Sequence, residues 1–118
     1  MREIWKVIEG YNGKYEVSSY GRVKSFYRNN WIFLKPNPDR EGYLSVDLVN
    51  NTQRKTFKIH RLVCAYFHPN PELKREVNHI NMDKSNNHYF NLEWCTSKEN
   101  KEHAKKFKLL PKKSTIVP

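Results

Sequence analysis

Between residues 14 and 60 the sequence is divided into short alternating segments, and this feature constrains the fold more than any other. Turn-forming residues separate the segments: Asn12-Gly13, Asn29-Asn30, residues 36–42 and Asn50-Asn51. In the segment 43–49, Leu44, Val46 and Leu48 fall on one face, as in a strand with one buried side. We therefore predict antiparallel β-hairpins, with strands over residues 14–18, 20–26, 31–34, 43–49 and 56–60.

The periodicity changes at residue 61. Apolar side chains at 62, 63, 66 and 67 fall on one helical face, which predicts a helix over residues 61–67. Pro69 and Pro71 follow and cannot continue a helix. This helix separates the hairpins from the second half of the chain.

A strand, loop, strand and helix complete the chain. Strands are predicted over residues 76–80 and 91–95, around a polar loop at 81–89. Thr96 and Glu99 form a capping box that begins a helix running to about Phe107. The fold class is therefore α+β. We divide the chain into a β-rich N-terminal module (1–58), a helix-plus-ββα segment (59–107) and a loose basic tail (108–118).

The charge balance is strongly basic, with 22 Lys and Arg against 12 Asp and Glu and a formal net charge of +10. Such an excess on a small protein favours a polyanionic partner, with nucleic acid first. An anionic membrane surface is the weaker reading, because no long helix has one basic and one apolar face. RNA binding stays open on charge and aromatic content alone.

The two cysteines, Cys64 and Cys95, each lie in an apolar segment and are predicted to be buried thiols in a reducing compartment. They form no C-x₂-C pair, so a zinc knuckle is disfavoured. The N-terminal residues lack the apolar stretch of a secretory signal, and no apolar run is long enough for a bilayer. We expect a cytoplasmic protein.

Imidazole and amide side chains are distributed over the last three elements. Asn78-His79 lies in one strand, Asn91 begins the next, and Asn100 and His103 share one face of the final helix. Folding the strands back onto the helix can bring these groups together. A neutral imidazole can deprotonate water, and a divalent ion can stabilise the leaving oxygen of a phosphodiester. Taken singly, each residue fits an ordinary structural or surface role equally well.

The order of these residues is more specific. Residues 77–104 resemble the HNH motif of phage and intron-encoded homing endonucleases, with Asn78-His79, Ser85-Asn86-Asn87, Asn91 to Trp94 and the Glu99-Asn100 helix start as the matching parts. Residues 60–67 and Pro69 to Pro71 resemble the helix that leads into it. Residues 3–25 are similar to the short module that commonly precedes this type of HNH domain.

The resemblance implies a ββα-metal (His-Me finger) fold and a role for each motif position. His79 corresponds to the general base, and Asn91 to the middle residue of the motif, which holds the loop and His79. Asn78 and Asn100 correspond to metal-ligand positions, and His103 to the last position of the motif, where a residue can bind metal, contact phosphate or do neither. An amide at position 78 lacks the charge of the aspartate that some relatives carry there. The cofactor implied is one divalent ion, Mg²⁺ or Mn²⁺.

The implied function is a metal-dependent DNA endonuclease of a phage in a bacterial host cell, nicking one strand of double-stranded DNA as a monomer. The alternative is an inactive HNH-fold protein that binds DNA as a regulator. The helix-turn-helix of intron-encoded relatives does not follow, so we expect a short footprint unless a homodimer or protein partner extends it. The basic residues expected to contact DNA are Arg22, Lys24, Arg28, Lys35, Arg40, Arg54, Lys55, Lys58, Arg61, Lys101 and Lys105.

Overall fold

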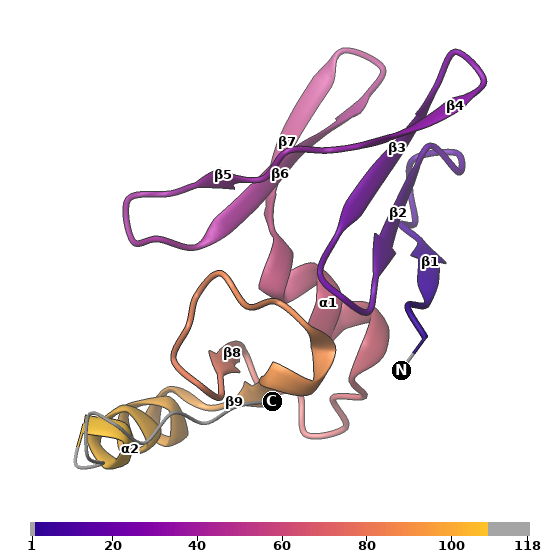
Figure 1. Cartoon of the computed structure of the whole chain (residues 1–118). Helices are drawn as coiled ribbons and strands as arrows, with labels where there is room; N and C mark the ends of the chain where they lie inside the picture. Colours follow the sequence, from indigo (N-terminus) through magenta and orange to yellow (C-terminus); the bar gives the residue numbers. More distant parts are fainter. Residues whose placement is uncertain (1, 109–118) are drawn as a thin grey trace.

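The computed structural model describes residues 2–108, which form three antiparallel sheets and two α-helices (Figure 1). The first sheet has the strand order β1-β2-β3-β4, the second β5-β6-β7 and the third β8-β9. The strands are β1 (Trp5–Val7), β2 (Tyr15–Ser18), β3 (Val23–Tyr27), β4 (Asn30–Phe33), β5 (Asn37–Pro38), β6 (Leu44–Asn50), β7 (Gln53–Lys58), β8 (Glu76–His79) and β9 (Leu92–Cys95). The helices are α1 (Ile59–Phe67) and α2 (Ser97–Lys108), with a 3₁₀ turn at Tyr89–Asn91.

Helix α1 lies at the centre of the molecule, with the hairpins on one side and the β8–β9 pair on the other (Figure 1). Its buried residues Leu62, Val63 and Cys64 belong to a single hydrophobic core. The same core takes Val17 from β2 and Leu48 from β6. Both halves of the chain therefore bury their apolar faces against one helix, and neither has a separate interior.

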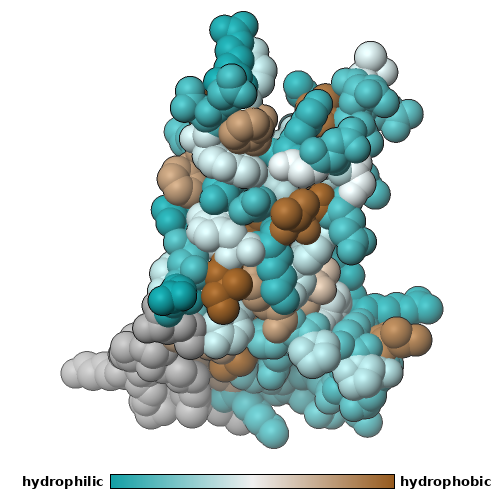
Figure 2. All heavy atoms as spheres, turned by 90° about the vertical axis from the view of Figure 1, so that its right-hand side faces the viewer, coloured by the Kyte–Doolittle hydropathy of each residue, from teal (hydrophilic) through white to brown (hydrophobic). Residues whose placement is uncertain are grey.

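Two hairpins, β3–β4 and β6–β7, extend beyond this core (Figure 1). Residues Arg28 and Asn29 connect β3 to β4 with φ of 50° and 64°. Two consecutive positive φ values are typical of the type I′ turn, whose twist matches that of the flanking strands. Seen from the β1–β4 side, both tips project upward and are mainly hydrophilic (Figure 2).

The final ββα unit is set by the register of β8 on β9 and by the start of α2. His79 pairs with Leu92, and Asn78 pairs with Glu93. At the start of α2 the Glu99 N–H donates to Thr96 Oγ1 (3.1 Å), and the Thr96 N–H donates to Glu99 Oε1 (2.9 Å). The predicted capping box is therefore present, and it fixes where α2 leaves the sheet.

The α+β class and the order of the elements are confirmed, with differences at the boundaries. Helix α1 begins at Ile59 rather than at residue 61, so the predicted strand 56–60 ends at Lys58. The predicted strand 20–26 starts only at Val23, because residues 20–22 form a turn. Strands β1 and β5 were not predicted, since segments of two or three residues carry no measurable alternation. Residues 109–118 of the predicted tail lie outside the described residues.

The burial of both cysteines is confirmed. Burial raises the pKa of Cys64 to about 12 and that of Cys95 to about 11, so both thiols stay protonated. In the described part of the chain, neither helix has the length and apolar character that crossing a membrane requires.

Candidate active site

His79, at the end of β8, is buried and is held by one hydrogen bond. Its Nε2 lies 2.8 Å from Oδ1 of Asn87, a buried residue of the loop between β8 and β9. Because an amide oxygen only accepts hydrogen bonds, Nε2 carries the ring hydrogen. The other nitrogen, Nδ1, then keeps its lone pair, and no other described residue hydrogen-bonds this ring. The arrangement fits an imidazole that accepts a proton at Nδ1.

The surroundings of His79 keep it uncharged. Burial lowers its pKa, while the Asn87 hydrogen bond and the nearby Asp83 carboxylate oppose that shift and Lys84 adds to it. The ring of His60 lies 5.0 Å from the His79 ring, and the two repel each other in their charged forms. A neutral imidazole is the form that can take a proton from water.

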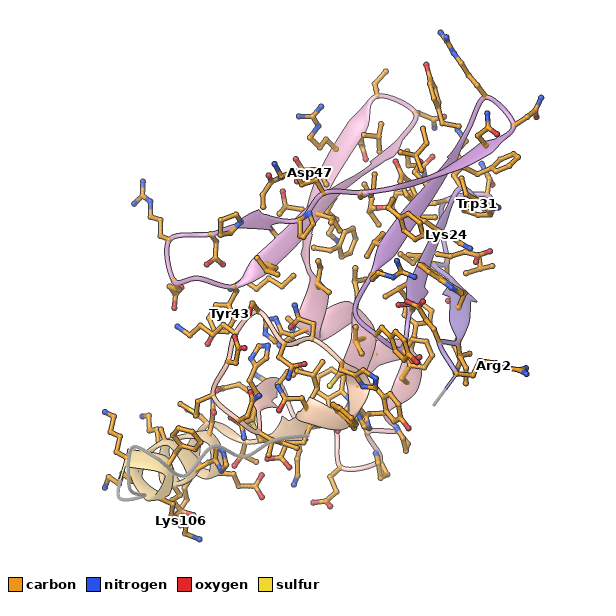
Figure 3. The ribbon with its side chains drawn as sticks, in the orientation of Figure 1. Arg2, Lys24, Trp31, Tyr43, Asp47 and Lys106 are labelled. Atoms are coloured by element: carbon orange, nitrogen blue, oxygen red, sulfur yellow. The ribbon has the colours of Figure 1, made fainter. Side chains whose placement is uncertain are left out.

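The rings of Tyr43, His60 and His79 form a cluster in which each ring lies within 5.9 Å of the other two. Tyr43 lies 4.9 Å from His60 and 5.9 Å from His79, measured between ring centroids. Figure 3 places Tyr43 at the base of β6, above the loop that connects β8 to β9. The ammonium groups of Lys58 and Lys84 lie 5.0 and 4.6 Å from the centre of the Tyr43 ring. The cluster therefore joins the second sheet to the candidate base, with two ammonium groups over its Tyr43 ring.

Asn91 holds the β8–β9 loop in shape. Its amide nitrogen donates to Asn81 Oδ1 (2.9 Å) and to the carbonyl of Asn86 (2.9 Å). Its own Oδ1 accepts from the Asn81 N–H (3.0 Å). The residue is buried and belongs to the 3₁₀ turn rather than to β9, where the sequence placed it. Its contacts fit a structural role, with no direct bond to His79.

The amides of Asn78 and Asn100 are each oriented by a carboxylate. The Asn78 Nδ2 donates to Glu93 Oε1 (3.0 Å) on the neighbouring strand. The Asn100 Nδ2 donates to Glu76 Oε1 (3.1 Å), which joins α2 to β8. With both nitrogens engaged, the two amide oxygens remain as acceptors or ligands. Residues 76 and 78 share one face of β8, because side chains alternate along a strand.

His103 contacts the same strand one turn along α2 from Asn100. Its Nε2–H donates to the carbonyl of Ile80 (2.8 Å), the residue after His79. The structure thus brings Asn100 and His103 to β8 and to the residue that follows it, whereas the sequence predicted that they would lie close to His79. Within the described residues no hydrogen bond joins His79 to Asn100, since the His79 ring bonds to Asn87 and the Asn100 amide to Glu76.

The donor set determines which ion these residues could hold. Within residues 2–108, no three His, Cys, Asp or Glu side chains gather into a group suited to a metal ion. The oxygens of Asn78, Asn100, Glu76 and Glu93 are hard donors of the kind that Mg²⁺ and Mn²⁺ prefer. The residues present fit a weakly held divalent cation whose coordination is completed by substrate oxygens and water.

The predicted DNA-contacting residues fall into two groups. Some are already engaged: Arg22 pairs with Glu3 and lies over Phe33, Lys24 pairs with Glu16, Lys58 with Asp39, Arg61 donates to the Arg75 carbonyl, and Arg28 and Lys55 lie over aromatic rings. Within the described residues, no ion pair, hydrogen bond or ring contact involves the side chains of the others, Lys35, Arg40, Arg54, Lys101 and Lys105.

Three arginines lie at or near the turns of the three hairpins. Arg28 lies at the β3–β4 turn, Arg54 next to the β6–β7 turn and Arg40 in the β5–β6 turn. All three are exposed. Each hairpin therefore carries a guanidinium group at or near its tip.

The outer face of the first sheet alternates cations with aromatic rings. Lys24 lies 4.2 Å from the Trp5 ring and 4.7 Å from the Trp31 ring, and Figure 3 shows Lys24 and Trp31 together on that side. Phe33 is 56% exposed, although large aromatic side chains are usually buried. The face is suited to contacts with a polyanion that also offers flat, apolar groups.

Sequence reasoning missed several of these side chains. Asn87 was recognised only as part of a loop motif, and nothing in its spacing assigns it to His79. Glu76 and Glu93 could have been found, since residues 76 and 78 share a strand face and residue 93 pairs with 78 in an antiparallel hairpin. His60 and Tyr43 come from distant elements, and no local pattern connects them to His79.

Comparison with known families covers most of the chain. Residues 3–49 match the NUMOD4 motif, and residues 57–102 match the HNH endonuclease family. An uncharacterised HNH endonuclease of Acanthamoeba polyphaga mimivirus is 44% identical over 92 residues, which are 78% of this chain and 27% of that protein. The DNA endonuclease I-HmuI of Bacillus phage SP01 is 38% identical over 99 residues, covering 84% of this chain and 56% of the relative.

One solved structure is similar to the whole fold. A solved structure of the HNH homing endonuclease I-HmuI, described as binding and cleaving DNA, superposes on this chain with a TM-score of 0.79 at 36% identity. The match covers 92% of this chain and 61% of that one. The chain thus spans between about a quarter and three fifths of the length of these relatives.

Proposed function

Because the chain belongs to the HNH endonuclease family, with a NUMOD4 motif before its nuclease segment, we propose that it is a metal-dependent DNA endonuclease that nicks one strand as a monomer. The observation that carries the proposal is the hydrogen bond from His79 Nε2 to Asn87 Oδ1, which leaves Nδ1 as the proton acceptor. Residues 1–58 then serve as the DNA-binding module and residues 59–107 as the nuclease segment.

The residues of the chain divide the reaction between them. His79 takes a proton from a water molecule, which attacks the phosphorus in line with the leaving oxygen. The amide oxygens of Asn78 and Asn100 would hold a divalent ion, Mg²⁺ or Mn²⁺, which when bound stabilises the charge on the leaving oxygen. Asn91 keeps the loop closed around this arrangement, and His103 ties α2 to the end of β8.

Two parts of the surface support DNA as the substrate. The hairpin arginines Arg28, Arg40 and Arg54 extend from the body, where they can neutralise phosphates or enter a groove. Lys101 and Lys105 add charge along α2, beside the candidate site. The relative I-HmuI is described as binding and cleaving DNA, which agrees with this assignment.

The proposal can be tested with supercoiled plasmid. Incubation with Mg²⁺ or Mn²⁺ should convert supercoiled DNA to the open circle, and His79→Ala should abolish this while still shifting a DNA duplex in a gel. Linear product without an open-circle intermediate at single-turnover enzyme levels would argue against a nicking monomer. Equal cleavage by His79→Ala would remove His79 from the mechanism.

One observation favours a second function. Asn78 carries no charge, and its amide nitrogen is held by Glu93, so the ion site is weak by itself. A protein that binds DNA on this scaffold and regulates without cutting would have the same features. Tight duplex binding with no product under Mg²⁺, Mn²⁺, Co²⁺ or Ni²⁺ would establish this function in place of the nuclease.

A further inference from the structure

A turn of the N-terminal module packs against the loop that connects β8 to β9 in the nuclease segment. This turn, residues 18–22, joins β2 to β3, and residues 87–89 of the loop lie against it. The carbonyl of Ser19 accepts a hydrogen bond from the Tyr89 N–H (2.8 Å), and Ser19 is only 1% exposed. The ring of Tyr20 stacks on His88 with 4.7 Å between centroids. The two segments are far apart in sequence, yet they share a backbone bond and a ring stack.

Gly21 makes the closest approach. A Cβ atom at this position would lie 2.7 Å from both the Cβ and the carbonyl oxygen of Asn87, and 2.9 Å from its carbonyl carbon. Its φ of +87° is also one that other residues rarely adopt. The turn can therefore lie directly on the Asn87 backbone only because residue 21 has no side chain.

The turn itself is rigid enough to act as a support. Ser18 Oγ accepts from the N–H groups of Tyr20 and Arg22, each at 3.1 Å. Ser19 Oγ accepts from the Ile4 N–H at 2.9 Å, which ties the turn to the start of the chain. Ser18 and Ser19 are both fully buried. Displacing this turn would therefore leave their hydroxyl groups and the N–H groups bonded to them without hydrogen-bond partners.

On the other side of Asn87 is the candidate base. Asn87 is 5% exposed and His79 is 4% exposed, so the bond between them is shielded from water. A buried bond of this kind fixes both the ring orientation and the nitrogen that carries the hydrogen. Two contacts therefore connect the turn to His79: Gly21 packs on the backbone of Asn87, and the side-chain amide of Asn87 hydrogen-bonds to the His79 ring.

We propose that the turn at residues 18–22 positions the general base: it fixes Asn87, and Asn87 holds His79 with Nε2 as donor and Nδ1 as acceptor. The N-terminal module then contributes to the catalytic step itself, in addition to any contact that it makes with DNA. This inference rests on the proposed function, because it takes His79 to be the base.

The first test compares two glycine substitutions. Gly21→Ala should lower kcat about 100-fold, because a base displaced by about 1 Å loses most of its effect. Its Kd for a duplex should stay within about threefold of the original value, since no DNA-contacting group is removed. Gly10→Ala is the matched control: Gly10 has a φ of +90° and nothing within 4 Å of its Cβ position. It imposes the same backbone strain and should leave kcat unchanged.

The second test measures directly which nitrogen of the His79 ring carries the hydrogen. The imidazole ¹⁵N signals of His79, identified by their loss in His79→Ala, should report a protonated Nε2 and an unprotonated Nδ1. In Gly21→Ala the two signals should move toward each other as both tautomers become populated, and in Gly10→Ala they should not. This measurement needs no cleavage, so it tests the positioning even in a protein that does not cut.

Asn87 supplies a pair of variants for the case that Gly21→Ala does not fold. Asn87→Asp keeps an oxygen acceptor in place and should retain most of kcat. Asn87→Leu has a similar shape without an acceptor and should lose about 100-fold in kcat at unchanged Kd. Equal kcat in the two variants would overturn the role of Asn87.

The outcomes separate the inference from the function on which it rests. If His79→Ala is inactive but Gly21→Ala keeps the kcat and the ¹⁵N signals of the original protein, the positioning role is wrong and the nuclease assignment stands. A loss in Gly21→Ala that lies entirely in Kd also overturns the positioning role. If His79→Ala cleaves normally, the assignment of the base fails, whatever the glycine variants do.

Discussion

The buried ring of His60 packs against the rings of both Tyr43 and His79, and burial lowers its pKa to about 3. The unfolded chain binds a proton at this residue below about pH 6.5, whereas the folded protein does not until about pH 3. Stability is therefore complete above pH 6.5 and is lost as the pH falls toward 3, by up to about 1.4 kcal/mol per pH unit for this group.

His60→Phe should remove this part of the acid sensitivity, because phenylalanine fills the same place and does not titrate. Urea unfolding between pH 4.5 and 8 would measure it: the loss of unfolding free energy on acidification should be smaller in the variant. His79 retains its own contribution, in the same direction, because its pKa is also lowered. Identical pH profiles for the two proteins would contradict the burial argument.

Asn78 allows a second prediction at the residue scale. In Asn78→Asp a carboxylate would face Glu93, whose oxygen now accepts from the amide at 3.0 Å. Two like charges repel, and residue 78 is only 4% exposed, so the substitution should cost at least about 1 kcal/mol without metal, and a divalent ion should reverse the effect. We expect a lower melting temperature in EDTA and a larger rise with Mn²⁺ than in the original protein. An equal Mn²⁺ response in both would argue that residue 78 does not approach the ion.

At the scale of single elements, the β3–β4 hairpin combines a strained residue with an exposed charge. Arg28 holds a φ of 50°, which costs a side-chain-bearing residue roughly 1 kcal/mol, and asparagine less. Arg28→Asn should therefore raise the free energy of unfolding by about 0.5 kcal/mol and weaken duplex binding. Asn29→Gly relaxes the same turn without removing a charge, and it should stabilise the protein with binding unchanged. Thermal melts measure the change in stability, and fluorescence anisotropy measures the affinity for duplex DNA.

How far the sequence predicts each element depends on the range of the interactions that form it. The Thr96–Glu99 capping box and the alternation of Leu44, Val46 and Leu48 are local, and both were located correctly. The start of α1 was misplaced, because TFKIH alternates like a strand and only tertiary packing puts Ile59 and His60 in the helix.

The candidate site divides in the same way. The positions of Asn78, His79, Asn100 and His103 along β8 and α2 followed from strand and helix geometry and from the family resemblance. Their partners did not: the bond from Asn87 to His79 and the approach of Gly21 depend on how a loop folds over a distant turn. Such contacts leave no periodic signature, because neither segment is regular.

At the scale of the whole molecule, charge is arranged on projections around a shared core. Each side chain that neutralises a phosphate steepens the salt dependence of log K by about 0.9. Arg40→Ala and Arg54→Ala should each lower that slope by about 1, since these arginines have no acidic partner among the described residues. Arg22→Ala should lower it less, because the guanidinium is paired with Glu3. Titrations of duplex DNA from 50 to 300 mM KCl would give the slope of log K against log salt for each variant. Equal slopes for all three variants would contradict the assignment of Arg40 and Arg54 to phosphate contacts.

The close fit between Gly21 and Asn87 has a consequence for protein engineers who retarget such enzymes by exchanging recognition modules. A chimera joined at the β7–α1 junction, near residue 58, would place a foreign turn against a loop that evolved with another. The fusion boundary in sequence is then a poor guide to what must be transplanted. The donor residues equivalent to 87–89 should be transferred with the donor module, so that the turn and the loop that packs on it come from the same protein.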